Sequence, residues 1–97
     1  MNVRFEDEHL HQMETDPQFD GGYEQGVAKK FRMVMNVIRQ APDERDFYQL
    51  KSLHFEKLRG SRSEQRSMRL NQQWRLIVRI EDGSPKTIVI VGIEDYH

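Results

Sequence analysis

Apolar residues recur at helical spacing in the first half of the chain. Val27, Phe31, Val34 and Ile38 repeat every three or four positions within residues 23–40, and the charged residues there fall largely on the opposite side. A proline two positions beyond this segment bars the continuation of a helix. The spacing therefore predicts an amphipathic helix over 23–40, which needs a sheet to lie on.

Two shorter patterns precede this helix. Residues 2–5 alternate between apolar and polar positions and predict a strand, while residues 6–14 predict a short helix with Leu10 and Met13 turned inward. An Asp-Pro pair and a Gly-Gly pair then separate the short helix from the longer one. The N-terminal quarter is thus expected to add one strand and one helix.

The second half of the chain changes to a period of two. Residues 67–70 and 74–80 alternate, and residues 87–93 form a nearly continuous β-branched run that suits a central strand. We expect one helical turn over 43–48 and a weaker strand over 49–58. Together these patterns predict an α+β fold, in which N-terminal helices pack on a small, twisted, mainly antiparallel sheet.

The register of one hairpin follows from its apolar residues. If Met68 and Leu70 face the same core as Trp74 and Leu76, the two strands must pair residues whose numbers sum to an even value. The natural solution pairs Leu70 with Trp74 and Met68 with Leu76. Residues 71–73 then form a three-residue loop.

That register also places two arginines side by side. Arg69 lies directly opposite Arg75 on the other face of the sheet. Like charges that face each other across two strands destabilise a sheet, so they are not expected where the sheet has only a structural role. An anionic ligand would relieve the repulsion, and the pair therefore indicates a phosphate-binding role.

Composition narrows the class of protein. A chain of 97 residues cannot support two cores, so we expect a single domain over residues 1–97. Cysteine is absent, which removes disulfides and thiolate metal sites from consideration. The first twenty residues are polar and acidic and resemble neither a signal peptide nor a membrane span. We expect a soluble cytoplasmic protein with no membrane association.

The formal net charge of −1 hides an uneven distribution. Residues 1–26 contain seven acids and one base, whereas residues 51–79 contain eight bases and two acids. Clustered bases focus a local positive potential even when the whole molecule is nearly neutral. The second half of the chain is therefore the part that suits a phosphodiester substrate.

The same half resembles a known family of toxins. Its motifs, taken in order, are similar to those of the HigB group of the RelE/ParE superfamily, the toxins of bacterial toxin–antitoxin pairs. The residues that carry the resemblance are Leu53-His54, Leu58-Arg59-Gly60, Ser67-Met68-Arg69-Leu70, Trp74-Arg75-Leu76-Ile77, Glu81-Asp82-Gly83 and Glu94-Asp95-Tyr96-His97. The N-terminal half agrees with the family only in layout.

The resemblance implies a RelE-like fold and a ribosome-dependent endoribonuclease, or mRNA interferase. Such a toxin enters the ribosomal A site and cuts the mRNA codon there, through attack of the ribose 2′-OH on the adjacent phosphate, and so inhibits translation. The implied partners are the ribosome, mRNA and a cognate HigA-like helix-turn-helix antitoxin, with operator DNA reached only through the antitoxin. No cofactor or metal ion is expected.

Four residues are candidates for catalysis. Arg75 is the first choice for stabilising the phosphorane-like transition state, because a guanidinium grips two phosphate oxygens and keeps its charge. Arg69 is its partner across the hairpin. The resemblance makes His54 and Tyr96 the candidates for proton transfer to and from the reacting oxygens.

Six further residues are candidates for contact with RNA. They are Lys57, Arg59, Arg66, Asn71, Gln73 and His97. Lys57 and Arg59 are expected to contact phosphates, and the amide side chains and Arg66 to read a base or bind ribosomal RNA. His97, the last residue, is expected near the site.

Two alternatives from other classes stay open. A non-enzymatic toxin of the same fold, such as a gyrase inhibitor, would need the cationic surface but not the proton-transfer residues. A small RNA-binding domain would hold phosphate between the two arginines without cleaving it. The terminal Tyr-His pair favours the enzyme.

Overall fold

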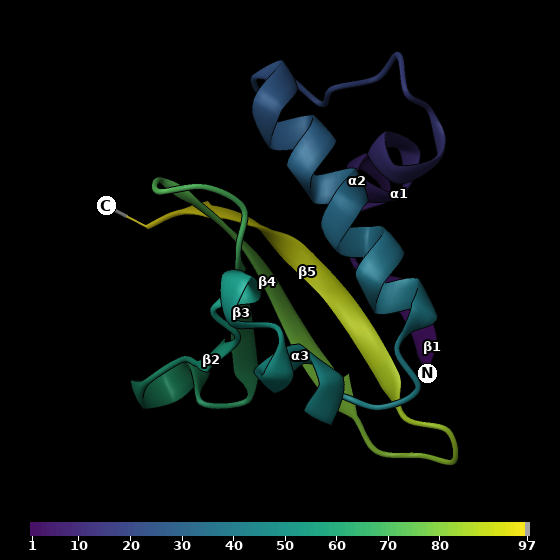
Figure 1. The fold of residues 1–97 in the computed structure, drawn as a ribbon, viewed down its shortest axis with the longest axis vertical. Coiled ribbons are helices and arrows are strands. Elements are labelled where there is room, and N and C mark those ends of the chain that lie inside the picture. The colour runs from purple at the N-terminus through teal and green to yellow at the C-terminus, as the bar shows by residue number, and fades with distance from the viewer. Residues whose placement is uncertain (97) are drawn as a thin grey trace.

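The computed structural model describes residues 1–96 as a five-stranded sheet with helices packed on one face (Figure 1). Along the chain the elements are β1 (Asn2–Phe5), α1 (Glu8–Thr15), α2 (Gln25–Gln40), α3 (Arg45–Gln49), the 3₁₀ turn η1 (Lys51–Leu53), β2 (Glu56–Lys57), the 3₁₀ turn η2 (Gly60–Arg62), β3 (Gln65–Arg69), β4 (Trp74–Glu81) and β5 (Thr87–Asp95). The strand order is β1-β5-β4-β3-β2. This arrangement confirms the predicted α+β class.

The long helix packs on the sheet through the stripe that its spacing predicted. Val27, Phe31, Val34 and Ile38 are all buried. They share one core with residues of α1 and of the sheet, namely Leu10, Met13, Met68, Leu76, Val78, Ile88 and Ile90. Each buried side chain of this size contributes about 1.5–3 kcal/mol, so this contact holds the two layers together.

The helices agree with their predicted extents to within two residues at each end. α1 corresponds to the helix expected over 6–14, and α2 corresponds to the helix expected over 23–40. The single turn expected over 43–48 is α3. None of the helices in the described residues is long and apolar enough to cross a membrane.

The sheet is mainly antiparallel, with one parallel edge. β3, β4 and β5 form the predicted meander, and β2 extends it at one edge. β1 pairs with β5 in parallel, with Val3 beside Ile88 and Phe5 beside Ile90. The first strand of the chain therefore lies next to the last, as Figure 1 shows.

A β-bulge in β5 changes which of its residues face the helices. Val78 pairs with Ile90, whereas Ile77 pairs with Gly92, so Val91 is an extra residue on β5. Because side chains alternate along a strand, the residues beyond the bulge face the opposite way from what simple alternation would give. Gly92, which interrupts the β-branched run over 87–93, is the local sign of this bulge, and it was not used in the sequence prediction.

The bulge places an acid beside the two opposed arginines. Arg69, Arg75 and Glu94 are neighbours across β3, β4 and β5, on the face that turns away from the helices. We call this side of the sheet the polar face; Arg79 lies on it as well, four residues after Arg75 on the same strand. The polar face carries most of the charged contacts described below.

The strand expected over 49–58 is wrong for most of its length. Only Glu56–Lys57 forms a strand there, paired with β3. The preceding residues form η1, and His54 then adopts a left-handed backbone conformation, with φ of 47°, that regular strand geometry does not include. Leu53 and Phe55 are nevertheless buried, because a tight turn also directs apolar side chains into the core.

Candidate active site

The β3–β4 hairpin has the register that its apolar residues predicted. Met68 pairs with Leu76, and Arg69 pairs with Arg75. Met68 and Leu76 are completely buried against the helices, which forces the two arginines onto the polar face. The predicted opposition of two guanidinium groups is therefore confirmed.

Both arginines line one cavity on the polar face. Its volume is about 150 Å³, equivalent to a few water molecules at about 30 Å³ each. It is lined by His54, Arg69, Asn71, Gln72, Arg75 and Tyr96. All the residues predicted to carry catalysis thus meet around one cavity, although they come from separate parts of the chain.

Arg75 is buried but incompletely paired. The residue is 7 % exposed. Its Nη2 lies 3.4 Å from Oε2 of Glu56, and its Cζ lies 4.5 Å from the centre of the Tyr96 ring. Its Nε is buried and has no hydrogen-bond partner within residues 1–96. An unpaired buried donor costs about 1–3 kcal/mol, so an anion that accepts from this Nε would be bound favourably.

Arg69 contacts the predicted histidine. Its Nη1 lies 3.3 Å from Nε2 of His54. A guanidinium has only donors, so this contact is a hydrogen bond in the tautomer whose Nε2 is unprotonated. The contact places the imidazole of His54 at the wall of the cavity, beside Arg69.

The backbone of His54 is strained. The left-handed conformation costs a non-glycine residue about 1–2 kcal/mol. Strain of this kind persists where the surrounding structure fixes it, and it is found most often at functional sites. Here it turns the chain between η1 and β2 while the imidazole lies against Arg69.

Tyr96 borders the cavity just beyond the end of β5. Its backbone N–H donates to the carbonyl oxygen of Gln73 at 2.7 Å, which fixes this end of the chain to the hairpin loop. The Arg75 guanidinium lies over its ring, in a cation–π contact. Tyr96 is still 49 % exposed, so a substrate can reach it.

The hairpin loop has a structural role in addition to the predicted contact with RNA. Oδ1 of Asn71 accepts hydrogen bonds from the backbone N–H groups of Gln73 and Trp74, at 2.8 and 2.7 Å. Nε2 of Gln73 donates to Oδ2 of Asp95 at 3.0 Å. Asn71 lines the cavity and Gln73 does not, whereas Gln72, which the sequence did not single out, does.

The other residues predicted to bind RNA lie outside this cavity. Lys57 and Arg66 are paired across β2 and β3 and line a separate cavity. Arg66 also donates to the carbonyl oxygen of Ser63 at 3.1 Å. Arg59 is exposed and lines neither cavity, and His97 lies outside the described residues.

Sequence reasoning missed the acids beside the arginines. Glu56 contacts Arg75, and Glu94 lies opposite Arg75 but bonds to Arg62. Glu56 directly follows the apolar Phe55, so the alternation expected over 49–58 placed its side chain on the other face. Glu94 reaches the polar face only because of the bulge, and its partner is 32 residues away in sequence, which no local pattern reveals.

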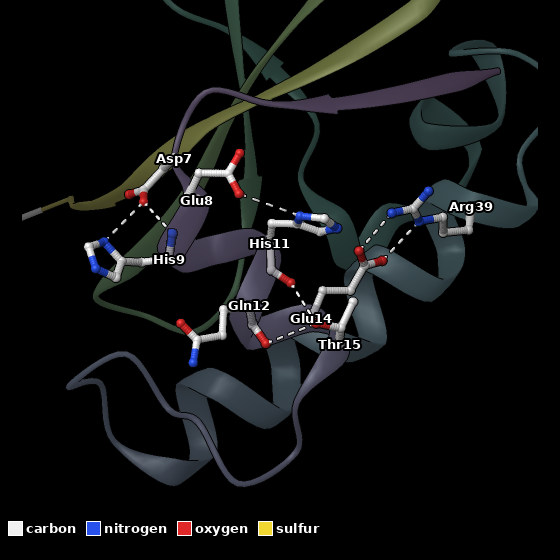
Figure 2. A network of polar contacts seen from close by, with 8 residues as sticks. All are labelled: Asp7, Glu8, His9, His11, Gln12, Glu14, Thr15 and Arg39. Carbon is white, nitrogen blue, oxygen red and sulfur yellow. Dashed lines mark hydrogen bonds and ion pairs between the residues drawn. The ribbon is translucent and has the colours of Figure 1, made fainter.

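The acidic N-terminal segment forms a separate network on α1 (Figure 2). His9 lies 3.5 Å from Asp7, and His11 lies 3.6 Å from Glu8. In the part of the chain that the structure describes, no group of three or more His, Cys, Asp or Glu side chains is placed to hold a metal ion. Each histidine therefore belongs to a local contact on the helix surface.

The fold and this cavity together define a small α+β domain with a cationic site on its sheet. Among solved structures, the YoeB/ParE toxin from Agrobacterium tumefaciens is similar over 100 % of both chains, with a TM-score of 0.57 and 15 % sequence identity. The toxin–antitoxin complex RelBE2 from Mycobacterium tuberculosis is matched over 97 % of this chain and 95 % of that chain, with a TM-score of 0.46 and 21 % identity. No curated protein matches the sequence.

The family model defines the class of protein as a RelE-like toxin. Residues 3–97 match the HigB-like toxin family, described as the RelE-like toxin of the type II toxin–antitoxin system HigB. The chain belongs to this family, and the resemblance noted in its C-terminal motifs is confirmed. It is a type II toxin, and a toxin of this type has an antitoxin as its partner.

Proposed function

We propose that this toxin is a ribosome-dependent endoribonuclease that cuts mRNA in the A site. The observation that carries the proposal is the one cavity around which Arg69, Arg75, His54 and Tyr96 meet. Cleavage by an internal 2′-OH needs a proton acceptor, a proton donor and cations at the phosphate. This cavity holds a group of each type.

The scissile phosphate binds between the two guanidinium groups. Arg75 offers Nε, which is unpaired, and Nη2, whose contact with Glu56 is long at 3.4 Å. Two such donors suit two oxygens of one phosphate. A phosphate also relieves the repulsion between Arg69 and Arg75. Charge held in a largely buried site stabilises the negative charge that develops in the transition state.

The reaction is an attack of the ribose 2′ oxygen on the adjacent phosphorus. The new 2′ O–P bond forms as the bond to the 5′ oxygen breaks, which leaves a 2′,3′-cyclic phosphate on one product and a 5′-hydroxyl on the other. The imidazole of His54, which lines the cavity, is the base that takes the 2′ proton, and its Nε2 must exchange the contact with Arg69 for the 2′-OH. Tyr96 is then the acid that protonates the departing oxygen.

The remaining parts of the proposal concern partners and place. The antitoxin is a HigA-like helix-turn-helix protein that keeps the toxin off the ribosome, and operator DNA is reached only through it. Lys57, Arg59 and Arg66 bind RNA phosphates outside the cavity, with Asn71 and Gln73 contributing from the hairpin loop. The protein acts in the cytoplasm, where translation occurs.

The test compares two arginine variants on translating ribosomes. Arg75→Ala is expected to leave ribosome-bound mRNA uncut and cell growth normal, whereas Arg45→Ala serves as the control because its side chain is 84 % exposed and lies outside the cavity. Arg75→Ala protein that folds and still cuts message would contradict the proposal. Wild-type protein that inhibits gyrase and spares message would support the non-enzymatic class instead.

A further inference from the structure

The residue across from Arg75 on β5 is a carboxylate that does not bind it. Glu94 and Arg75 are cross-strand partners on the polar face. Side chains in such positions have Cβ atoms about 4.5–5.5 Å apart, and opposite charges there form stabilising pairs. Glu94 is therefore within reach of the buried guanidinium, but it is bound elsewhere.

Glu94 is held by Arg62. Nη1 and Nη2 of Arg62 donate to the two carboxylate oxygens of Glu94 at 2.8 and 2.6 Å, a bidentate pair. Nε of the same guanidinium donates to Oε1 of Gln65 at 2.9 Å, which fixes its orientation from β3. The hydrogen bond to Glu94 is also the largest cause of a raised pKa of Arg62.

This pair joins two distant parts of the sheet. Arg62 belongs to η2, which connects β2 and β3, whereas Glu94 lies on β5. The strand between β3 and β5 is β4, which carries Arg75. The Arg62–Glu94 pair therefore crosses the polar face at the position of the candidate active site.

The consequence appears at Arg75. With Glu94 withheld, Arg75 keeps the 3.4 Å ion pair to Glu56, the Tyr96 ring and a buried Nε that has no partner within residues 1–96. Had Glu94 paired with Arg75, a carboxylate would occupy the donors that a phosphate needs. Such a carboxylate, held in a largely buried site, would compete strongly with any incoming anion.

We propose that Arg62 is a positioning residue that holds Glu94 away from Arg75 and so keeps the anion-binding cavity available. The identity of the anion, an RNA phosphate, rests on the proposed function. The pairing of Arg62 with Glu94 does not depend on the proposed function. Removal of Arg62 lets Glu94 turn to Arg75, and phosphate must then displace a carboxylate from Nε and Nη2.

The first readout follows Arg75 in the protein without ligand. Purified toxins carrying Arg62→Gln, Glu94→Gln and both changes are compared with the wild type by NMR of the Arg75 Nε–H group. In Arg62→Gln the signal is expected to shift and its exchange with water to slow, since Nε gains a carboxylate acceptor. Both effects should disappear in the double variant.

The second readout is binding of inorganic phosphate to the same four proteins. Arg62→Gln is expected to weaken binding about tenfold, as for a competing charged hydrogen bond. Glu94→Gln should bind at least as tightly as the wild type, because it removes a neighbouring carboxylate. The double variant should match Glu94→Gln, so the second change rescues the first. Amide NMR spectra check that all four proteins are folded.

Other outcomes overturn the proposal. If Arg62 merely braces η2, then Arg62→Gln, Glu94→Gln and the double variant will weaken binding alike. If Arg62 itself binds the anion, the double variant will be as weak as Arg62→Gln. An Arg75 Nε–H signal that is the same in Arg62→Gln and in the wild type also contradicts the proposal. Wild-type protein that binds no phosphate would instead count against the proposed function, while the Nε–H signal would still decide the role of Arg62.

Discussion

The polar face holds two groups of arginines that differ in how fully they are neutralised. In the first, Arg79 bonds to two carboxylates and Arg4 shares one of these, Glu81. In the second, Arg69 contacts a histidine and Arg75 has one long ion pair among residues 1–96. We call these the paired group, Arg4 and Arg79, and the open group, Arg69 and Arg75.

The difference separates a structural use of arginine from a functional one. Arg79 and Arg75 lie on the same face of the same strand, so strand geometry does not distinguish them. The carboxylates distinguish the two arginines. Arg79 is bonded to Glu6 and Glu81, whereas the acid opposite Arg75 is bound by another arginine. A guanidinium whose donors are already bonded to carboxylates links strands and has few N–H donors left for a ligand. An unsaturated, buried one is a site for an anion.

The largest expected effect is on activity, and it separates the two groups. Arg75→Ala should lower mRNA cleavage on ribosomes at least about 100-fold, the loss typical for a residue that stabilises transition-state charge. Arg79→Ala should cleave within a few-fold of the wild type. Single-turnover cleavage of ribosome-bound message measures both.

Stability should show the opposite order. Arg79→Ala should lower the Tm by a few degrees, because it breaks contacts to Glu6 and Glu81. Arg75→Ala should change the Tm less than its burial suggests, since it also removes an unpaired donor and a like-charge pair. If the two variants behave alike in both assays, the division into groups fails.

Arg69→Gln should improve stability while it harms function. The change removes the repulsion between Arg69 and Arg75, which is expected to raise the free energy of unfolding by a few tenths of a kcal/mol, about the size of other cross-strand pairs. Cleavage should fall about tenfold or more, because one of the two cations at the phosphate is lost. Urea unfolding and the cleavage assay give the two numbers. A less stable variant would argue against strain between the arginines.

Two substitutions at His54 separate the strain of its backbone from the role of its imidazole. Glycine adopts the left-handed conformation freely, so His54→Gly should be more stable than His54→Ala by about 1 kcal/mol. Both variants should lose the proton acceptor and therefore most activity. Equal stabilities would show that the backbone at position 54 relaxes, and full activity would remove the imidazole from the mechanism.

The smallest effect is on the acid sensitivity of the paired group. Hydrogen bonds from Arg79 and then Arg4 lower the pKa of Glu81 below its ordinary value of 4.5. A carboxylate whose pKa is lowered in the folded state stabilises the protein at any pH above its ordinary pKa. This contribution is lost as the pH falls through the folded-state pKa. Glu81→Gln should therefore lose less stability than the wild type below about pH 4.5. Thermal unfolding across that range would detect it, and parallel curves would contradict it.

Local pattern was enough to predict the hairpin and the helices. The alternation that buries Met68 and Leu76 also determines that Arg69 meets Arg75, because side-chain parity on a strand leaves no freedom. The stripe on α2 likewise fixed the face that packs on the sheet. These features depend on residues close together in sequence.

What could not be predicted depends on irregular backbone or distant partners. Leu53 and Phe55 have the two-residue spacing of a strand, so residues 49–58 were taken for a strand, and no hydrophobic pattern marks the left-handed turn at His54 between them. The bulge at Val91 lies in a nearly continuous β-branched run, where Gly92 alone does not fix its position, and it decides where Glu94 points. The partner of Glu94 lies on another element, so the device that leaves Arg75 unpaired is visible only in three dimensions.

The most direct test of the central claim is a titration of the wild-type toxin with inorganic phosphate, followed by NMR at the Nε–H groups of Arg75 and Arg79. The incompletely neutralised site should take up phosphate, so the Arg75 signal should shift and saturate while the Arg79 signal stays in place. Shifts of equal size at both arginines, or none at Arg75, would contradict the account.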